Sequence, residues 1–168
     1  MQRTRAIFGS ALFLVVVPGT VAGYGPWAIS QWHFNAPLFG CFPLRVIGVL
    51  LIAAGLPLLL DSFLRFALQG LGTPAPIAPP QNLVVSGLYR YVRNPMYVAV
   101  LSLILGQGLL FGNVTVLQYG VLVWVTFFLW VVLHEEPTLR GKFGAEYETF
   151  CAHVPRWIPR VKPWQGSA

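Results

Sequence analysis

The sequence predicts an all-α fold: an integral membrane helical bundle with about four transmembrane helices and a C-terminal amphipathic helix at the membrane interface. Of the 168 residues, 56% are hydrophobic and only 10% are charged, and the mean hydropathy is +0.67. A soluble domain carries about 25% charged residues, so a soluble helical domain of this composition would lack polar groups for its surface. Residues 98–133 carry no charge and are long enough for two crossings and a turn. We expect one membrane domain over residues 1–168, with two N-terminal helices in 1–69 and a second half in 81–159.

The first half of the chain contains two expected helices. The first covers residues 6–22 and is interpreted as a retained helix, because no convincing small-residue cleavage site of a signal peptide follows it. A charge-free, aromatic connection over residues 23–43 suits the membrane interface. The second helix starts near Leu44, stays apolar to Leu60 and extends toward Gln69.

Three sequence features are expected to shape the second helix and the segment that follows it. Pro57 is expected to kink it. Asp61 and Arg65 are expected to pair as i and i+4 residues on its extension. A linker rich in Gly and Pro, residues 70–80, cannot be helical and is expected to run extended.

A helical hairpin is expected next. Asn94 has the residue type of an N-cap and Pro95 suits the first helical position, so the third helix runs from there to about Phe111. Gly112 and Asn113 form the turn, and the fourth helix covers residues 114–133. A hairpin returns its ends to one side of the bilayer, so the polar segments that flank it should meet at one membrane surface.

The tail carries apolar side chains at helical spacing between Leu139 and Val154. Most charged residues of this segment fall on other faces, which predicts an amphipathic helix lying on the bilayer surface. Gly141 and Gly144 weaken this helix and Pro155 ends it.

The charges predict the topology and argue against nucleic acid as a partner. The formal net charge is +6, but the basic residues are scattered and no stretch is both basic and water-exposed. Lys and Arg concentrate in the N-terminus, in the loop 61–97 and in the tail, so the positive-inside rule places both termini in the cytoplasm of a multi-pass protein. Cys41 and Cys151 fall at different membrane faces and predict no disulfide, and no residue spacing indicates a metal site.

Two polar segments flank the hairpin and contain the candidates for chemistry. One is residues 134–140, in which Glu135 and Glu136 follow His134 at the end of a transmembrane helix. A carboxylate there is costly unless it is solvated or partnered, so one of the two could hold a cationic group such as an ammonium. The alternative is that both residues only end one helix and begin the next.

The other polar segment, residues 86–97, has three tyrosines close to two arginines. These residues could form a pocket for a flat heterocycle and a cation, since aromatic faces attract cations. The alternative is an aromatic belt at the membrane interface with snorkelling arginines. The residues concerned are Tyr89, Tyr91, Tyr97, Arg90 and Arg93.

These motifs resemble a family of integral-membrane methyltransferases that includes isoprenylcysteine carboxyl methyltransferase and phospholipid N-methyltransferases. The family pattern is Gly-x-Tyr-x-x-x-Arg-(His/Asn)-Pro-x-Tyr, a helical hairpin, Glu-Glu-x-x-Leu and then Phe-Gly-x-Glu-Tyr. In this chain the three motifs begin at Gly87, Glu135 and Phe143, and the resemblance covers about residues 81–159.

The resemblance implies S-adenosylmethionine as the cofactor and a site at the cytoplasmic face. The positions that would surround the cofactor are Gln81, Leu83, Val84, Tyr89, Asn94, Pro95, Met96, Tyr97 and Glu135. The candidate catalytic residues are Glu136, Arg93 and His134. Glu136, His134 or solvent could take a proton from an amine acceptor, and Arg93 or Arg140 could hold a lipid phosphate.

The identity of the methyl acceptor stays open at this point. We expect a lipophilic acceptor that enters from the bilayer between helices near Pro57, with membrane lipids as the other partners. The prenylcysteine enzymes have His at the position of Asn94 and a substrate-binding Arg at the position of Val131, whereas residues 154–156 look like that branch. The alternative function is a non-catalytic membrane scaffold or transporter subunit of the same helical shape, which would not need Tyr89, Tyr97 and Glu135 together.

Overall fold

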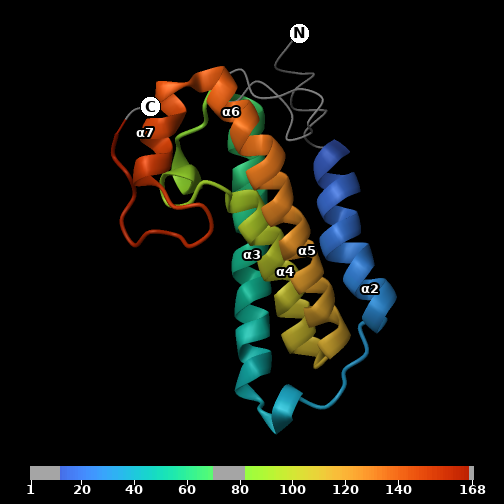
Figure 1. Ribbon diagram of the computed structural model, residues 1–168. Helices are drawn as coiled ribbons and strands as arrows, with labels where there is room; N and C mark the ends of the chain where they lie inside the picture. Colours follow the sequence, from blue (N-terminus) through green and yellow to red (C-terminus); the bar gives the residue numbers. More distant parts are fainter. Residues whose placement is uncertain (1–11, 70–81, 167–168) are drawn as a thin grey trace.

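The computed structural model describes residues 12–69 and 82–166, and these residues form a bundle of helices in which no strand occurs (Figure 1). Three helical stretches are long and apolar enough to cross a membrane: Leu12–Ser30, Pro43–Arg65 and Val114–Phe143. A shorter apolar helix, α4 (Pro95–Phe111), lies among them. The predicted helical membrane bundle is therefore confirmed.

The first helical stretch continues past its predicted end at Ala22. A π-helical turn, η1 (Gly19–Tyr24), leads directly into α2 (Gly25–Ser30). The predicted connection from residue 23 is therefore wrong in its first part, and only residues 31–42 connect to the next long helix, with one 3-10 turn, η2 (Leu38–Gly40). The predicted start of this first helix, before residue 12, lies outside the described residues.

Side chains from other helices explain how the chain stays helical here. Pro26 has no backbone N–H, so the carbonyl groups of Val21 and Ala22 have no helical donor at that position. The hydroxyl of Tyr119 donates to the Val21 carbonyl at 2.9 Å, and the amide of Gln107 donates to the Ala22 carbonyl at 2.7 Å. Unpaired carbonyl groups are costly in lipid, so these two bonds fix the first stretch against the rest of the bundle.

Glycine residues allow α3 (Pro43–Gln69) and α4 to pack closely along each other. A Cβ atom on Gly48 would lie 2.7 Å from the carbonyl oxygen of Gly106, and one on Gly106 would lie 2.8 Å from that of Gly48. Small residues at a crossing let two backbones approach, which is a common packing device in membranes. The helix α3 remains continuous through Pro57 and reaches Gln69 as expected.

The fourth helix is longer than the sequence predicts. The helix α5 (Val114–Trp130) passes through a π-helical turn, η4 (Val131–Glu135), into α6 (Glu136–Phe143), so the predicted end at Leu133 is wrong. Pro137 lacks an N–H and lies two residues after the end of the π-helical turn, which explains the change of hydrogen-bond pattern.

The predicted amphipathic tail helix is two helices. At Gly144 the backbone has φ 52° and ψ −125°, which ends α6 and separates it from α7 (Ala145–His153). This conformation is open to glycine and strained for other residues, so Gly144 breaks the helix outright instead of only weakening it.

The segment before α4 packs against the end of α3. Asp61 and Arg65 form the expected i,i+4 ion pair at 2.8 Å, and Gly87, with φ +54°, packs directly against the Arg65 side chain at the start of the short turn η3 (Gly87–Arg90). Pro95 begins α4 as predicted, but the side chain of Asn94 makes no cap. The predicted linker 70–80 lies outside the described residues.

Candidate functional site

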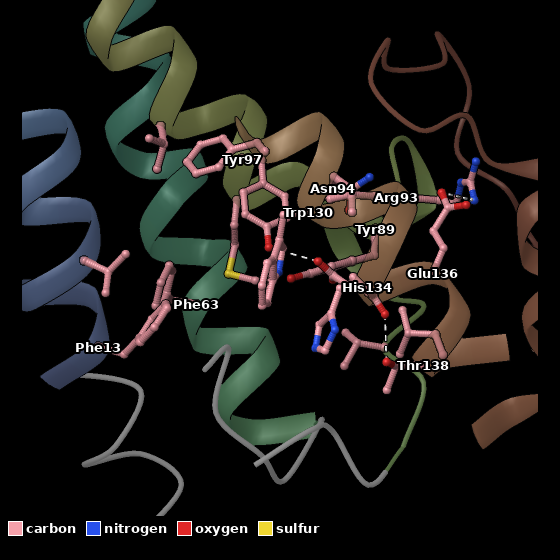
Figure 2. A pocket seen from close by; sticks show the side chains of 18 of the residues that line it. Phe13, Phe63, Tyr89, Arg93, Asn94, Tyr97, Trp130, His134, Glu136 and Thr138 are labelled. Carbon is pink, nitrogen blue, oxygen red and sulfur yellow. Dashed lines mark hydrogen bonds and ion pairs between the residues drawn. The ribbon is translucent and has the colours of Figure 1, made fainter. Parts of the chain in front are cut away.

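A pocket opens at the end of the bundle where α4 begins and α5 passes into α6 (Figure 2); Figure 1 shows where these helix ends lie. One wall is apolar and comes from the first helical stretch and α3: Phe13, Val17, Pro18, Val21 and Phe63. The opposite wall contains the polar side chains Tyr89, Arg93, Asn94, Tyr97, His134, Glu135, Glu136 and Thr138. Figure 2 shows Phe13 and Phe63 on one side of this space and Arg93, Asn94 and Glu136 on the other.

The structure brings most of the predicted site residues to this one pocket. Ten of them line it: Leu83, Val84, Tyr89, Arg93, Asn94, Met96, Tyr97, His134, Glu135 and Glu136. Pro95 is buried at the start of α4 and is not among the lining residues, and Gln81 lies outside the described residues. The two polar segments that flank the hairpin therefore meet, as the hairpin predicts.

Tyr97 and Glu135 join the two segments directly. The Tyr97 hydroxyl donates a hydrogen bond to Oε2 of Glu135 at 2.9 Å. The ring of Tyr97 also lies 4.7 Å from that of Phe127, which fixes its orientation. The side chain of Glu135 is thus held at the pocket wall by a neutral donor, where a cationic ligand in the pocket could reach it.

Tyr89 has an unused donor inside the pocket. Its side chain is buried, and its hydroxyl has no hydrogen-bond partner. Burial, together with the nearby carboxylate of Glu135, raises the pKa of this phenol far above its usual value, so the hydroxyl stays protonated. A buried polar group without a partner is uncommon in a native protein, and here it indicates a place for a ligand atom.

Glu136 has different surroundings from Glu135. Its side chain is only 3% exposed, and Arg156 contacts both of its oxygens, Nε to Oε1 at 2.6 Å and Nη2 to Oε2 at 3.0 Å. Arg93 lies 3.2 Å and Arg140 3.5 Å from the same carboxylate. The hydrogen bond to Glu136 raises the pKa of the Arg156 guanidinium above its usual value, so this side chain stays positively charged.

The π-helical turn separates these two neighbouring carboxylates. Glu135 ends η4 and points to Tyr97, whereas Glu136 begins α6 and points to the arginines. The hydroxyl of Thr138, in α6, donates to the carbonyl of His134 in η4 at 2.7 Å. The exposed ring of His134 lies 4.4 Å from that of Trp130 at the edge of the pocket.

Sequence reasoning missed residues of the pocket wall and one residue behind it. It assigned no role to Arg156, which contacts Glu136 from outside the pocket, because nothing in the sequence placed that residue beside Glu136. It also missed Trp130 and Thr138, whose positions depend on the π-helical turn. The apolar wall of the first helical stretch has no local sequence signal beyond hydrophobicity.

Two further predictions concern disulfides and metal sites, and the structure bears on them for the residues that it describes. Cys41 is exposed and Cys151 partly buried, and both are free thiols. The described parts of the chain contain no group of three or more His, Cys, Asp or Glu side chains that could hold a metal ion.

Comparisons with known proteins agree with these motifs. The sequence model of the phospholipid methyltransferase family matches residues 44–146. The chain is 39% identical over 80 residues to the protein-S-isoprenylcysteine O-methyltransferase of Schizosaccharomyces pombe, a match of 47% of this chain and 34% of the relative. It is 32% identical over 81 residues to protein-S-isoprenylcysteine O-methyltransferase B of Arabidopsis thaliana, a match of 48% of this chain and 41% of the relative.

The chain therefore covers less than half the length of each of these two relatives. No solved structure matches it significantly. The family match extends over most of the chain, from the start of α3 to the start of α7, and includes both polar segments of the pocket. The chain belongs to the phospholipid methyltransferase family.

Proposed function

We propose that this chain is an integral-membrane methyltransferase that uses S-adenosylmethionine to methylate a lipid-like or lipophilic acceptor at the cytoplasmic face. The observation that carries the proposal is the pocket itself, in which the two polar motifs meet opposite an apolar wall. Tyr89, Tyr97 and Glu135 lie together there, and a scaffold or transporter subunit of the same shape would not need that combination.

The residues of the polar wall fit the chemistry of the cofactor. S-adenosylmethionine carries an ammonium, a sulfonium and a flat adenine ring. Glu135 would hold a cationic group of the cofactor, and the unpaired hydroxyl of Tyr89 would donate to one of its acceptor atoms. Leu83 and Val84, which line the same pocket, would contact the adenosine part. When bound, the cofactor supplies a methyl group that is already activated for transfer.

With an activated donor, the protein mainly has to position the acceptor and exclude water. Holding reactants in near-attack geometry contributes about 7–11 kcal/mol. The rings of Tyr97, Phe127 and Trp130 line the pocket and give it an apolar, electron-rich lining next to the carboxylate. Aromatic faces attract cations, so this lining would favour a positively charged sulfonium over water.

The three candidate catalytic residues take separate roles in this proposal. The carboxylate of Glu136 is engaged by Arg93 and Arg156, so it serves to hold the site together and is poorly placed to take a proton. His134 is exposed at the pocket edge, and we assign to it the removal of a proton when the acceptor is an amine. Arg93 lines the pocket and remains the candidate for contact with an acidic group of the acceptor.

The apolar wall supports a lipophilic acceptor. Phe13 stacks on Phe63 with their ring centroids 6.2 Å apart, and Val17 and Val21 continue this surface along the first helical stretch. Pro57 does not line the pocket, whereas four side chains of the first stretch do, so we place the acceptor along the first stretch and not near Pro57. The relatives' names specify an isoprenylcysteine and the family's name a phospholipid, and both compounds carry long apolar chains.

Two measurements test the proposal in sequence. Calorimetry on the detergent-solubilised protein should detect binding of S-adenosylmethionine, and no heat at millimolar cofactor would favour the scaffold. Transfer of a radiolabelled methyl group should then be measured with phosphatidylethanolamine, a prenylated cysteine analogue, and small lipophilic thiols and amines. Transfer to one of these compounds, and none to their water-soluble headgroup analogues, is the expected result.

A further inference from the structure

We propose that Arg156 is a positioning residue that holds the two polar motifs of the pocket together. The inference rests on the proposed function, since the site that it positions is the one assigned to the cofactor. Arg156 belongs to residues 154–164, here called the C-terminal segment, which follow α7 and have no helical structure. Arg156 does not line the pocket itself.

The C-terminal segment runs beside the first polar motif and is bonded to its backbone. Three backbone N–H groups donate across this contact at 2.9 Å each: Arg93 to Pro155, Arg160 to Tyr91, and Trp164 to Arg90. The Arg90 side chain also donates to the Trp164 carbonyl. The segment therefore fixes residues 90–93, where the turn η3 ends just before α4.

Arg156 contacts both motifs at once. Its backbone carbonyl accepts a hydrogen bond from Nδ2 of Asn94 at 3.1 Å, which explains why Asn94 does not cap α4. Its guanidinium binds both oxygens of Glu136 in a bidentate contact. One residue outside the pocket thus connects the residue before α4 with the residue that begins α6.

This connection sets the direction of Glu135, the carboxylate assigned to the cofactor. Glu135 and Glu136 are adjacent, and the pull of Arg156 on Glu136 leaves Glu135 facing Tyr97. Arg93 and Arg140 also contact Glu136, but at 3.2 and 3.5 Å with one nitrogen each. Loss of the Arg156 side chain should therefore leave Glu136 paired and the protein folded, while the alignment of the two motifs loosens.

The test compares two substitutions at Arg156 with two matched arginines. Arg160 lies in the same C-terminal segment, but its side chain reaches only the carbonyl of His153, and Arg140 contacts Glu136 from α6 and not from the segment. Affinity for S-adenosylmethionine by calorimetry and thermal unfolding in detergent are measured for Arg156→Gln, Arg156→Lys, Arg160→Gln and Arg140→Gln. A loss of charge-assisted hydrogen bonds in Arg156→Gln should weaken binding about tenfold or more, at a nearly unchanged unfolding temperature.

The lysine variant separates geometry from charge. Lys keeps the positive charge but cannot make the two-pronged contact, so Arg156→Lys should restore only part of the affinity. Arg160→Gln and Arg140→Gln should bind the cofactor like the unsubstituted protein. If Arg156→Gln does not fold, Arg156→Lys decides the question by itself. Unchanged affinity in a folded Arg156 variant overturns the inference alone, whereas absence of cofactor binding by the unsubstituted protein overturns the proposed function with it.

Discussion

The hydroxyl of Tyr97 donates to Glu135 across 2.9 Å, and this bond joins two motifs that are separated in the chain by the whole of a transmembrane hairpin. Tyr97 lies in the first turns of α4, and Glu135 ends the π-helical turn after α5. The bond places a carboxylate beside aromatic rings at one end of the bundle. The first prediction concerns that carboxylate.

Replacing Glu135 by Gln should weaken binding of S-adenosylmethionine at least about tenfold, or 1.4 kcal/mol, because the amide keeps the shape but loses the charge. Calorimetry on detergent-solubilised protein measures the change. Glu146→Gln is the control, since Glu146 is exposed and does not line the pocket. Equal affinities of the two variants would remove Glu135 from the site.

Tyr89→Phe tests the unpaired hydroxyl. This hydroxyl has no partner within the protein, so its removal should leave the unfolding temperature unchanged or slightly higher. A hydrogen bond to the ligand is worth about 0.5–1.5 kcal/mol, so cofactor affinity should fall several-fold. Tyr91→Phe, outside the pocket, should alter neither quantity. A lower unfolding temperature with unchanged affinity would show that the hydroxyl has a structural partner instead.

Glu136→Gln should destabilise the fold. The substitution leaves Arg93, whose side chain is only 11% exposed, without its ion-pair partner. Removing one partner of a buried ion pair costs about 3–5 kcal/mol, which should lower the unfolding temperature clearly. Glu148→Gln is the matched control, because its pair with Arg140 is exposed and contributes little. If both variants unfold at the same temperature, the ion pairs of Glu136 with the arginines do not stabilise the fold.

The contact between α3 and α4 gives a fourth prediction. Gly48→Ala would bring a Cβ atom to 2.7 Å from backbone atoms of Gly106 and Leu110, so the helices must separate at a cost of about 1–3 kcal/mol. Gly141→Ala has open space around the new methyl group and should stabilise the protein by about 0.4–1 kcal/mol. Thermal unfolding in detergent compares the two, and the opposite order would contradict the close crossing.

The fifth prediction concerns the proposed orientation. Cys41 is exposed in the connection between α2 and α3, at the end of the bundle opposite α6 and α7 (Figure 1). With the pocket in the cytoplasm, a membrane-impermeant maleimide added to sealed right-side-out vesicles should label Cys41. Cys41→Ser should then show no labelling until the vesicles are opened. Labelling of Cys41 only in opened vesicles would reverse the topology.

The sequence predicts most of the fold because hydrophobic length and motif order determine it. The continuous apolar stretches identify the bundle, and Pro95 marks the start of α4 correctly. Two predicted helix ends, at Ala22 and at Leu133, were wrong. In each case a π-helical turn, η1 or η4, joins the helix to a further α-helix. In the first case, distant donors such as Gln107 make this possible, and their position depends on tertiary packing.

The candidate site, like the fold, could be predicted only in part. Residues of the motifs, such as Tyr89 and Glu135, could be predicted because the hairpin brings its two ends together. The roles of Glu135 and Glu136 could not be separated, because a shift of the helical hydrogen bonds at η4 determines which carboxylate faces the arginines. The apolar wall could not be predicted either, since a side chain such as Phe13 differs in no local way from a lipid-facing one.

Four of the five side chains named for the apolar wall come from a different part of the chain than the polar wall. Phe13, Val17, Pro18 and Val21 precede the region that the family shares, which begins at residue 44, whereas the tyrosines and carboxylates lie within it. Under the proposed function, the choice of acceptor and the binding of the methyl donor could therefore change independently. Exchanging the four N-terminal side chains for smaller or bulkier ones would then change which compound is methylated without altering the residues proposed to bind the donor.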